Sequence, residues 1–404
     1  MTQAETVAIT GLGCISTLGQ DVPTCWAALS TGSCGIGNLE GFDNSDLRVH
    51  KAAQVWHYNP TNHFSRAELA LLDRHSQLAV IAAREAAADA GLDENHLLSA
   101  AAVIGTGCGG KETDEQTYQK LYLDHKSRVH PFTIPRGMPS AAASQVSIKL
   151  GVQGPAFKIS SACASSNHAI AQAAIMIRSG MLDIALSGGT DAPFTYGLLK
   201  AWEAIRVLSS DTCRPFSLDR DGIVLGEGAG IVILESMKHA KNRGAKVYAE
   251  LAGLGMSADA AHITDSSSGG AARAMACALK DACITPAQVS YINAHGTGTI
   301  QNDPAETRAI KQVFGGHADN LLVSSTKSMH GHALGASGAI EFIATVLSLR
   351  HGIIPPTVNF TAPGDGCTLN YVPNRPVSLD YDMALSNSFG FGGLNAVLAI
   401  RGAD

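Results

Sequence analysis

The stretch ISSACASSNHAIAQAAIMIRSG, residues 159–180, joins the end of an expected apolar strand to an expected helix. The helical part is apolar almost all round, which predicts a helix buried on every side. Cys163 stands at its start, beside unpaired backbone N–H groups and the positive end of the helix dipole. Such a position lowers a thiol pKa from about 8.5 and favours the nucleophilic thiolate. On this stretch alone a buried structural cysteine is the more ordinary interpretation, because free cysteines are among the most buried residues.

The composition is typical of a globular enzyme. The chain has 404 residues, 45% of them hydrophobic, and a formal net charge of −6, which argues against general nucleic-acid binding. Nine cysteines without a C-x-x-C pair indicate reduced thiols in a cytoplasmic protein. We expect no signal peptide and no membrane span, since no stretch approaches about 18 uninterrupted apolar residues.

Expected strands and helices alternate along the chain. This rhythm predicts an α/β fold with a mostly parallel, buried sheet. The second half repeats the element order of the first, which indicates an internal duplication and two closely packed lobes. We expect strands at residues 6–13, 100–110, 156–163, 182–192, 247–259, 289–298 and 320–327, two strands within 383–400, and helices at 74–92, 269–282, 302–315 and 335–352.

Polar and aromatic residues gather in turns that follow the expected strands, where ligands bind in open α/β sheets. Besides the Cys163 turn, these are NAHGTGT (residues 293–299), STKSMHGH (325–332) and NSFGFGG (387–393). Each has an ordinary alternative: a core histidine, a solvated lysine or a simple glycine turn. His330 and His332 could bind a metal, but no acidic residue or zinc-type spacing accompanies them, so we expect no metal.

Taken in order, these strings resemble the β-ketoacyl-acyl-carrier-protein synthases of the thiolase superfamily, specifically the synthase II type. The most specific pieces are SSACASSNHAI (160–170), RPFSLDRDGIVLGEGAG (214–230) and STKSMHGHALGASGAIE (325–341). GMPSAAA (137–143) and SDTCRPFS (210–217) are similar to nodulation-type and type II polyketide or polyene ketosynthases. The resemblance implies a thiolase-like, duplicated five-layered α-β-α-β-α architecture with mixed sheets. It places the nucleophile and dimer-forming insertions in residues 1–246, and a second half in residues 247–404.

The resemblance also assigns catalytic residues. It makes Cys163 the acylated nucleophile, and His295 and His332 the catalytic histidines. Lys327 lies near the histidines, and Glu341 is its structural carboxylate partner. Two imidazole N–H groups suit a condensation that passes through an enolate, because they can stabilise the enolate oxygen without a metal.

Further residues are expected to hold the substrate. Backbone N–H groups of Cys163 and Phe391 would form the oxyanion hole, since glycines around Phe391 let the backbone approach a carbonyl. Thr297 and Thr299 match threonines that hold a phosphopantetheine arm, although turn capping explains them equally well. Phe389 and Cys108 are expected to contact the substrate, and Cys108 lines the acyl chamber, where its small size leaves room for a longer chain.

The implied reaction is a decarboxylative Claisen condensation, in which an acyl group on Cys163 is extended by two carbons from malonyl-acyl-carrier-protein with release of CO2. No bound cofactor is expected, because substrates arrive on the phosphopantetheine arm of an acyl carrier protein. A degradative thiolase would need a second cysteine in SNSFGFGGLN (386–395), which has none. A partner-dependent or non-catalytic subunit of a heterodimeric type II polyketide system remains the alternative to a homodimer.

The basic residues that relatives place at the carrier-protein entrance are few in this sequence. Residues 63–75 keep Arg66 and Arg74, and Lys126, Arg128 and Arg136 offer positive charge elsewhere. Docking of an acidic partner is therefore expected at a position that the sequence leaves open.

Overall fold

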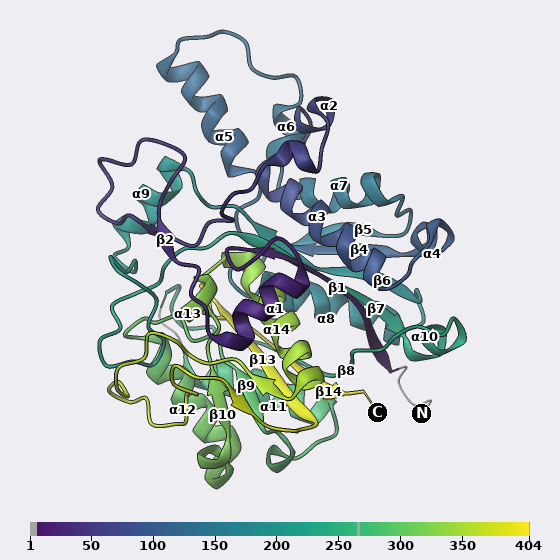
Figure 1. Cartoon of the computed structure of the whole chain (residues 1–404), viewed down its shortest axis with the longest axis vertical. Coiled ribbons are helices and arrows are strands. Elements are labelled where there is room, and N and C mark those ends of the chain that lie inside the picture. Colours follow the sequence, from purple (N-terminus) through teal and green to yellow (C-terminus); the bar gives the residue numbers. More distant parts are fainter. Residues whose placement is uncertain (1–5, 265–266, 404) are drawn as a thin grey trace.

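A computed structural model describes residues 6–264 and 267–403. Its ten principal strands form one sheet in the order β10-β9-β13-β14-β8-β1-β7-β6-β4-β5 (Figure 1). Their bounds are β1 (Val7–Ser16), β4 (Ala101–Gly105), β5 (Ala156–Ile159), β6 (Ile184–Asp191), β7 (Gly228–Ser236), β8 (Ala249–Ala258), β9 (Tyr291–Asn293), β10 (Leu322–Ser324), β13 (Met383–Gly390) and β14 (Leu394–Gly402). Two small sheets pair β2 (Gly37–Asn38) with β3 (Lys51–Ala52), and β11 (Ile353–Ile354) with β12 (Val377–Ser378).

The strand order is that of a duplication. From the outer edge inward, the two halves read β5-β4-β6-β7-β1 and β10-β9-β13-β14-β8, so strands of equal rank along the chain occupy equal positions. The halves meet where β1 pairs antiparallel with β8. A thiolase-like α/β fold with a mixed sheet is thereby confirmed. The division of the chain between residues 246 and 247 stays a prediction.

The expectation of a mostly parallel sheet was wrong. Within each half the outer strands are parallel, but β7 and β14 run antiparallel to both of their neighbours. The hairpin from β13 to β14 turns within three residues, and only antiparallel strands can be joined so tightly. Burial on both faces gave these strands the continuous apolar sequence that usually marks parallel ones.

Helices divide the molecule into layers (Figure 1). Helices α3 and α7 cover the outer side of the first half, α11 and α12 that of the second, and α8 and α14 lie between the halves. The helix bounds are α1 (Val22–Thr31), α2 (Arg66–Leu69), α3 (Arg74–Asp89), α4 (Glu94–Ser99), α5 (Lys111–Tyr118), α6 (Thr133–Gly137), α7 (Ala141–Leu150), α8 (Ser165–Arg178), α9 (Tyr196–Ala204), α10 (Met237–Asn242), α11 (Ser268–Asp281), α12 (Asn302–Phe314), α13 (Lys327–His330) and α14 (Ser337–His351).

The central helices explain why the sequence is apolar on all sides there. Every residue of α14 from Ser337 to Leu349 is buried, and α8 buries ten of its residues. Small residues let helix and sheet approach closely: a Cβ on Gly13 of β1 would lie 1.9 Å from the carbonyl oxygen of Ala82 in α3. Among the described helices, none is both long and apolar enough to cross a membrane.

Candidate active site

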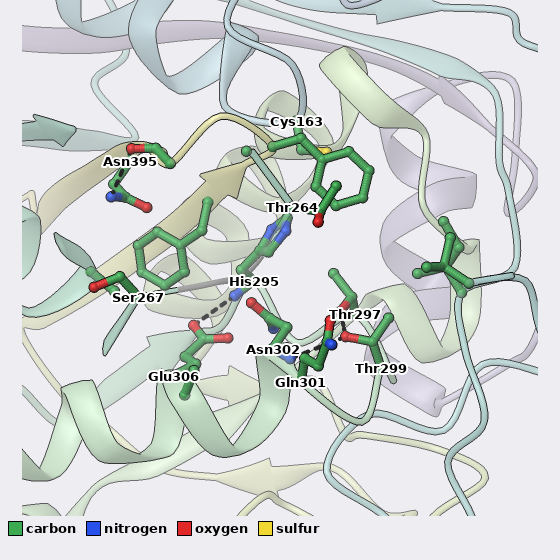
Figure 2. Close-up of a pocket in the computed structure, with 18 of the residues that line it drawn as sticks. Cys163, Thr264, Ser267, His295, Thr297, Thr299, Gln301, Asn302, Glu306 and Asn395 are labelled. Carbon is green, nitrogen blue, oxygen red and sulfur yellow. Dashed lines mark hydrogen bonds between the residues drawn. The ribbon is translucent and has the colours of Figure 1, made fainter. Parts of the chain in front are cut away.

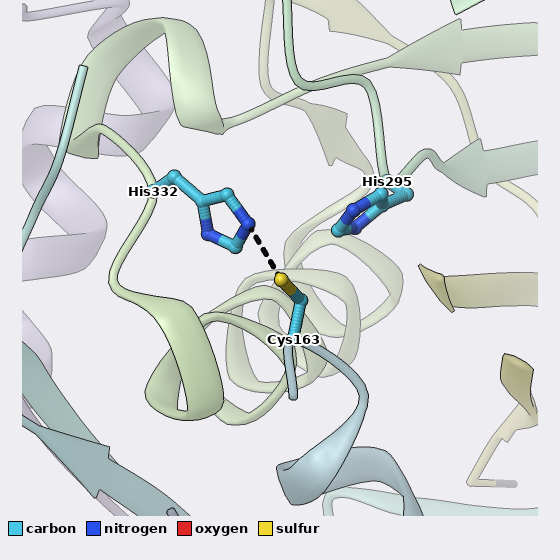
Figure 3. A group of neighbouring side chains, drawn as sticks. All are labelled: Cys163, His295 and His332. Carbon is cyan, nitrogen blue, oxygen red and sulfur yellow. Dashed lines mark hydrogen bonds between the residues drawn. The ribbon is translucent and has the colours of Figure 1, made fainter. Parts of the chain in front are cut away.

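Cys163, His295 and His332 converge from three distant segments (Figure 3). Cys163 lies between β5 and α8, His295 follows β9, and His332 follows α13. Nε2 of His332 is 3.1 Å from Sγ of Cys163, and the two imidazole rings lie edge to face with their centres 5.5 Å apart. All three residues are buried. The structure thus brings together the three residues that the sequence singled out as catalytic.

These residues lie at the inner end of a cavity of about 340 Å³ (Figure 2). Thr297, Thr299, Phe389 and Phe391 line the same cavity, as predicted. Cys108 lies outside this lining. It packs against an apolar cluster that adjoins the cavity and includes Leu199, Ile223 and Leu334.

The neighbours of His295 fix the position of its ring proton. Nζ of Lys327 lies 3.3 Å from Nδ1 of His295, and the same ammonium pairs with Glu341. An ammonium can only donate, so Nδ1 accepts and Nε2 carries the proton. Burial and the charge of Lys327 lower the pKa of His295 well below its usual value, so the ring is neutral.

His332 is fixed in the same tautomer by a different contact. The backbone N–H of Leu334 donates to Nδ1 of His332 at 3.2 Å, and Ser337 Oγ lies 2.9 Å from the same nitrogen. Its Nε2 therefore carries the proton and donates toward Cys163. Burial, with the charge of Lys327, holds the pKa of His332 well below its usual value. The site thus presents two neutral imidazole N–H donors.

The sequence analysis expected the helix end to lower the pKa of the Cys163 thiol, but the structure shifts this pKa upward. Burial raises the pKa of the Cys163 thiol to about 11, against the opposing effects of the Lys327 charge and the backbone N–H of Phe391. Cys163 precedes the first helical residue, Ser165, by two positions. The cost of a buried charge therefore outweighs the Lys327 charge and the Phe391 N–H, which favours a neutral thiol in the free protein.

Two carboxylates that the sequence analysis did not select hold the histidine turn. Glu306 accepts the backbone N–H groups of His295 at 2.9 Å and Gly296 at 2.8 Å (Figure 2). Asp303 accepts those of Thr297 at 3.1 Å and Gly298 at 3.2 Å. For Asp303 the available signal was its place in the first turn of α12, where acidic residues are favoured but can also accept from neighbouring loops; Glu306 lies in the next turn and carried no such signal.

A third carboxylate, Asp191, ties the two halves together beneath the site. Its fully buried oxygens accept the backbone N–H groups of Gly107 (2.8 Å), Cys108 (2.9 Å) and Gly335 (2.7 Å), and the hydroxyl of Thr106 (2.8 Å). The glycine-rich turn after β4 is thereby fixed to the turn that follows His332. Nothing in the local sequence around Asp191 pointed to this role.

The His330 and His332 pair does not act as a unit. His330 is buried and directs Nε2 at Thr326 Oγ1, 3.0 Å away, whereas His332 faces Cys163. The ligand atoms of Cys163, His295 and His332 do lie within 4.8 Å of one another, as a metal site requires. However, both Nε2 atoms carry protons that their neighbours fix in place, so this donor set fits hydrogen bonding better than metal ligation.

The thiolase-like fold agrees with what family comparison shows. Residues 4–240 match the beta-ketoacyl synthase N-terminal domain, and residues 248–361 match the beta-ketoacyl synthase C-terminal domain. The chain belongs to the beta-ketoacyl synthase family. It is a condensing acyltransferase of the synthase II type, which serves fatty acid or specialised chain elongation.

Individual relatives show which members of the family this chain is similar to. The chain is 48% identical over 397 residues to Nodulation protein E of Rhizobium sp. (strain N33), covering 98% of both chains. It is 43% identical over 410 residues to 3-oxoacyl-[acyl-carrier-protein] synthase 2 of Staphylococcus aureus (strain COL), covering 99% of both. The solved ishigamide ketosynthase/chain length factor superposes with a TM-score of 0.95 at 36% identity, with 100% of each chain covered.

Proposed function

We propose that Cys163 carries the growing acyl chain, and that His295 and His332 stabilise the enolate that extends it. The observation that carries this proposal is the position of the buried thiol, 3.1 Å from the Nε2–H of His332 and facing a second neutral imidazole. Neutral N–H donors in a site that excludes water are the groups that an enolate oxygen needs.

In the first step an acyl group moves from an acyl carrier protein to Cys163. The Cys163 S–C bond forms, the thioester bond of the donor breaks, and the thiol proton ends on the sulfur of the phosphopantetheine arm. The backbone N–H groups of Cys163 and Phe391 hold the carbonyl oxygen during the attack. The Phe391 N–H already faces the sulfur in the free protein.

In the second step a malonyl thioester loses CO2 and becomes an enolate. The Nε2–H groups of His295 and His332 bind the enolate oxygen, and Lys327 and Glu341 keep His295 in the donating tautomer. The enolate carbon attacks the acyl group and the bond to Cys163 sulfur breaks. The leaving thiolate takes a proton from solvent and becomes the neutral thiol again, while the ketoacyl product stays on the carrier protein. No bound cofactor or metal takes part in this scheme.

The cavity wall offers polar side chains that the phosphopantetheine arm of the carrier protein can contact. The hydroxyls of Thr297 and Thr299 lie 3.0 Å apart and line it beside His295. Hydroxyl groups can both donate to and accept from the amides of such an arm. Phe389 packs edge-on against the His295 ring at 5.9 Å and limits that ring's movement.

A second copy, or a related ketosynthase subunit, covers the segment from α5 to α6. This segment stands away from the sheet in Figure 1 and exposes Tyr122 (69%), Leu123 (73%) and Ile134 (77%). Strand β5 is the last strand at one edge of the sheet, so its outer backbone groups are available for pairing with a second subunit. The likeness to a ketosynthase/chain length factor supports a heterodimer as the alternative to a homodimer.

We infer that the enzyme extends the acyl chain of a specialised pathway. We also infer that it acts in the cytoplasm. Identity of 48% to a nodulation protein, and the likeness to the ishigamide ketosynthase, support the first assignment. Nine cysteines without a disulfide among the described residues support the second.

Intact-mass analysis tests the proposal. The purified chain is incubated with carrier proteins loaded with acyl groups of increasing length, and then with malonyl-loaded carrier protein. An adduct on Cys163 that is consumed as ketoacyl product forms is expected. An adduct that forms without product until a partner subunit is added would favour the partner-dependent alternative, and no adduct under any condition would favour the non-catalytic one.

A further inference from the structure

The turn that follows His295 is held at its two ends by different parts of the molecule. Glu306 accepts the backbone N–H of His295 at 2.9 Å and fixes the histidine end. At the other end the carbonyl oxygen of Thr299 accepts a hydrogen bond from Nε of Arg220 at 3.2 Å. The two threonines that line the cavity, Thr297 and Thr299, belong to this second end (Figure 2). The histidine and the threonines therefore have separate supports.

Arg220 is 9% exposed, and its guanidinium joins three segments of the chain. Besides the carbonyl of Thr299, it contacts the carbonyl of Ser217 through Nη1 at 3.0 Å and that of Asp365 through Nη2 at 3.5 Å. Within the described residues, all of its hydrogen-bond acceptors are thus backbone carbonyls. A guanidinium holds its N–H donors in one rigid plane, so it fixes the relative positions of the groups that it contacts.

Residues 213–222 make further contacts with the same turn. Sγ of Cys213 donates to the carbonyl of Thr297 at 3.6 Å. Gly298 has a φ of 78°, and a Cβ on it would lie 3.0 Å from the carbonyl oxygen of Gly222. Only a glycine suits that backbone conformation and that close approach. The turn and residues 213–222 are therefore packed against each other as one unit.

Asp303 belongs to the same unit. It accepts the backbone N–H groups of Thr297 and Gly298, and that of Phe216 at 2.6 Å. Burial raises the pKa of Asp303 to about 6, and the charge of Arg220 opposes this rise. Arg220 therefore lies close enough to favour the charged carboxylate that accepts these hydrogen bonds.

We propose that Arg220 is a positioning residue for the phosphopantetheine arm, because it holds the turn at 297–299 so that both threonine hydroxyls face the amides of the arm. This inference rests on the proposed function. The two hydroxyls lie only 3.0 Å apart, so a rotation of the turn would move both away from the arm together. Glu306 and Lys327 hold His295 separately, so loss of Arg220 should weaken binding of the arm and leave the histidine in place.

The test compares two acyl donors that differ in the arm. Octanoyl-pantetheine carries the arm amides, and S-ethyl octanethioate carries none. Arg220→Met should raise the half-saturating concentration of octanoyl-pantetheine for acylation of Cys163 at least about tenfold, because hydrogen bonds to the amides are lost. The maximal rate should stay within about threefold, and the rate with S-ethyl octanethioate within about twofold, since His295 is unmoved. Arg220→Lys keeps a charge and a donor, so its half-saturating concentration should lie between the two.

Further substitutions show whether Arg220 acts through the threonines. With Thr297→Val and Thr299→Val the hydroxyls are already absent, so adding Arg220→Met should raise the half-saturating concentration less than about twofold further. Gly364→Ala perturbs Arg220 without removing it, because a Cβ there would lie 2.0 Å from Nη1 and displace the guanidinium. It should cause a rise of the same kind, and it provides the test if Arg220→Met does not fold.

Arg178→Met is the matched control. Arg178 also donates to two backbone carbonyls, those of Leu251 at 3.2 Å and Ala252 at 3.1 Å. It is the last residue of α8 and lies at the opposite end of that helix from Cys163. Its half-saturating concentration with octanoyl-pantetheine and its rate with S-ethyl octanethioate should therefore be those of the unchanged protein.

Three results would overturn the proposal. They are an unchanged half-saturating concentration in Arg220→Met, a parallel loss of rate with both donors, and a full effect of Arg220→Met that persists without the threonine hydroxyls. If the unchanged protein were acylated by neither donor, the proposed function itself would fail. Acylation that saturates no more readily with octanoyl-pantetheine than with S-ethyl octanethioate would instead reject arm binding by the threonines and keep the chemistry at Cys163.

Discussion

Nε2 of His332 donates toward Sγ of Cys163 across 3.1 Å, although 169 positions separate the two residues in the chain. The backbone N–H of Leu334 occupies Nδ1 of the same ring and prevents the opposite tautomer. His332 is therefore a hydrogen-bond donor to the sulfur and, in the proposed mechanism, to the developing enolate. It is poorly placed to act as a base that removes the thiol proton.

Replacing Cys163 by serine should abolish the acyl adduct and lower condensation by a factor on the order of 10³ or more, because an alcohol is a far weaker nucleophile than a thiol. Intact-mass analysis and ketoacyl product formation measure the two effects. Cys283→Ser, which changes an exposed thiol, is the control and should behave like the unchanged protein. An undiminished rate in Cys163→Ser would reject covalent catalysis.

Lys327 and Glu341 form a fully buried ion pair, so removing one partner leaves the other without compensation. Lys327→Met should lower the free energy of unfolding by about 3–5 kcal/mol, and Lys327→Met with Glu341→Gln should recover most of it without recovering condensation. Urea unfolding measures stability. A double variant no more stable than the single would contradict this account.

The loss in Lys327→Met relative to the unchanged protein should also grow as the pH rises above about 7, where the unchanged protein's Glu341 is ionised. Burial raises the pKa of Glu341 to about 7 even beside the lysine, and without the lysine the carboxyl stays protonated in the folded state. The unfolded chain releases that proton above about pH 4.5, so stability falls as the pH rises from 5 to 8. The double variant lacks this carboxyl, so its stability relative to the unchanged protein should rise between about pH 5 and 7 and then level off.

Alkylation of Cys163 should depend steeply on pH. Since burial raises its pKa to about 11, the thiolate fraction and the rate with iodoacetamide should rise close to tenfold per pH unit from 7 to 9. Peptide mass spectrometry follows Cys163 separately from the exposed Cys277. A plateau already reached at pH 7 would show that the helix end and the donors outweigh burial after all.

Asp191 offers a test of stability. Its oxygens accept four hydrogen bonds, so Asp191→Ala leaves four donors unpaired, those of Thr106 and Gly335 fully buried, and should cost about 3 kcal/mol. Asp191→Asn should cost nearly as much, because its NH2 group would face backbone N–H donors. Asp319→Asn, at an exposed position, should leave thermal unfolding unchanged. A mild effect of Asp191→Asn alone would count against this network.

Removing metal ions with a chelator tests whether Cys163, His295 and His332 act through hydrogen bonds or bind a metal. Dialysis against EDTA should leave condensation unchanged, because the imidazole protons and not a metal provide the stabilising charge. Loss of activity on chelation, with recovery on adding Zn²⁺, would show that the 4.8 Å cluster holds an ion.

Local signals in the sequence sufficed for the main elements and for the core of the site. The apolar helix after Cys163 and the polar turns after strands pointed to the groups that meet in the structure, because strand ends of α/β folds gather ligand-binding residues. Glu306, Asp303 and Asp191 were not selected. They act on backbone N–H groups of other segments, and no pattern in their own neighbourhood records that contact.

The sequence by itself determined the turn that bears Cys163, the histidine turns, the duplicated rhythm of elements and the resemblance to a ketosynthase, since these depend on neighbouring residues. Only the tertiary structure decided the antiparallel placement of β7 and β14, the tautomers of His295 and His332, and the neutral state of Cys163. Each of these depends on burial and on partners from distant segments, and folding alone brings those partners together.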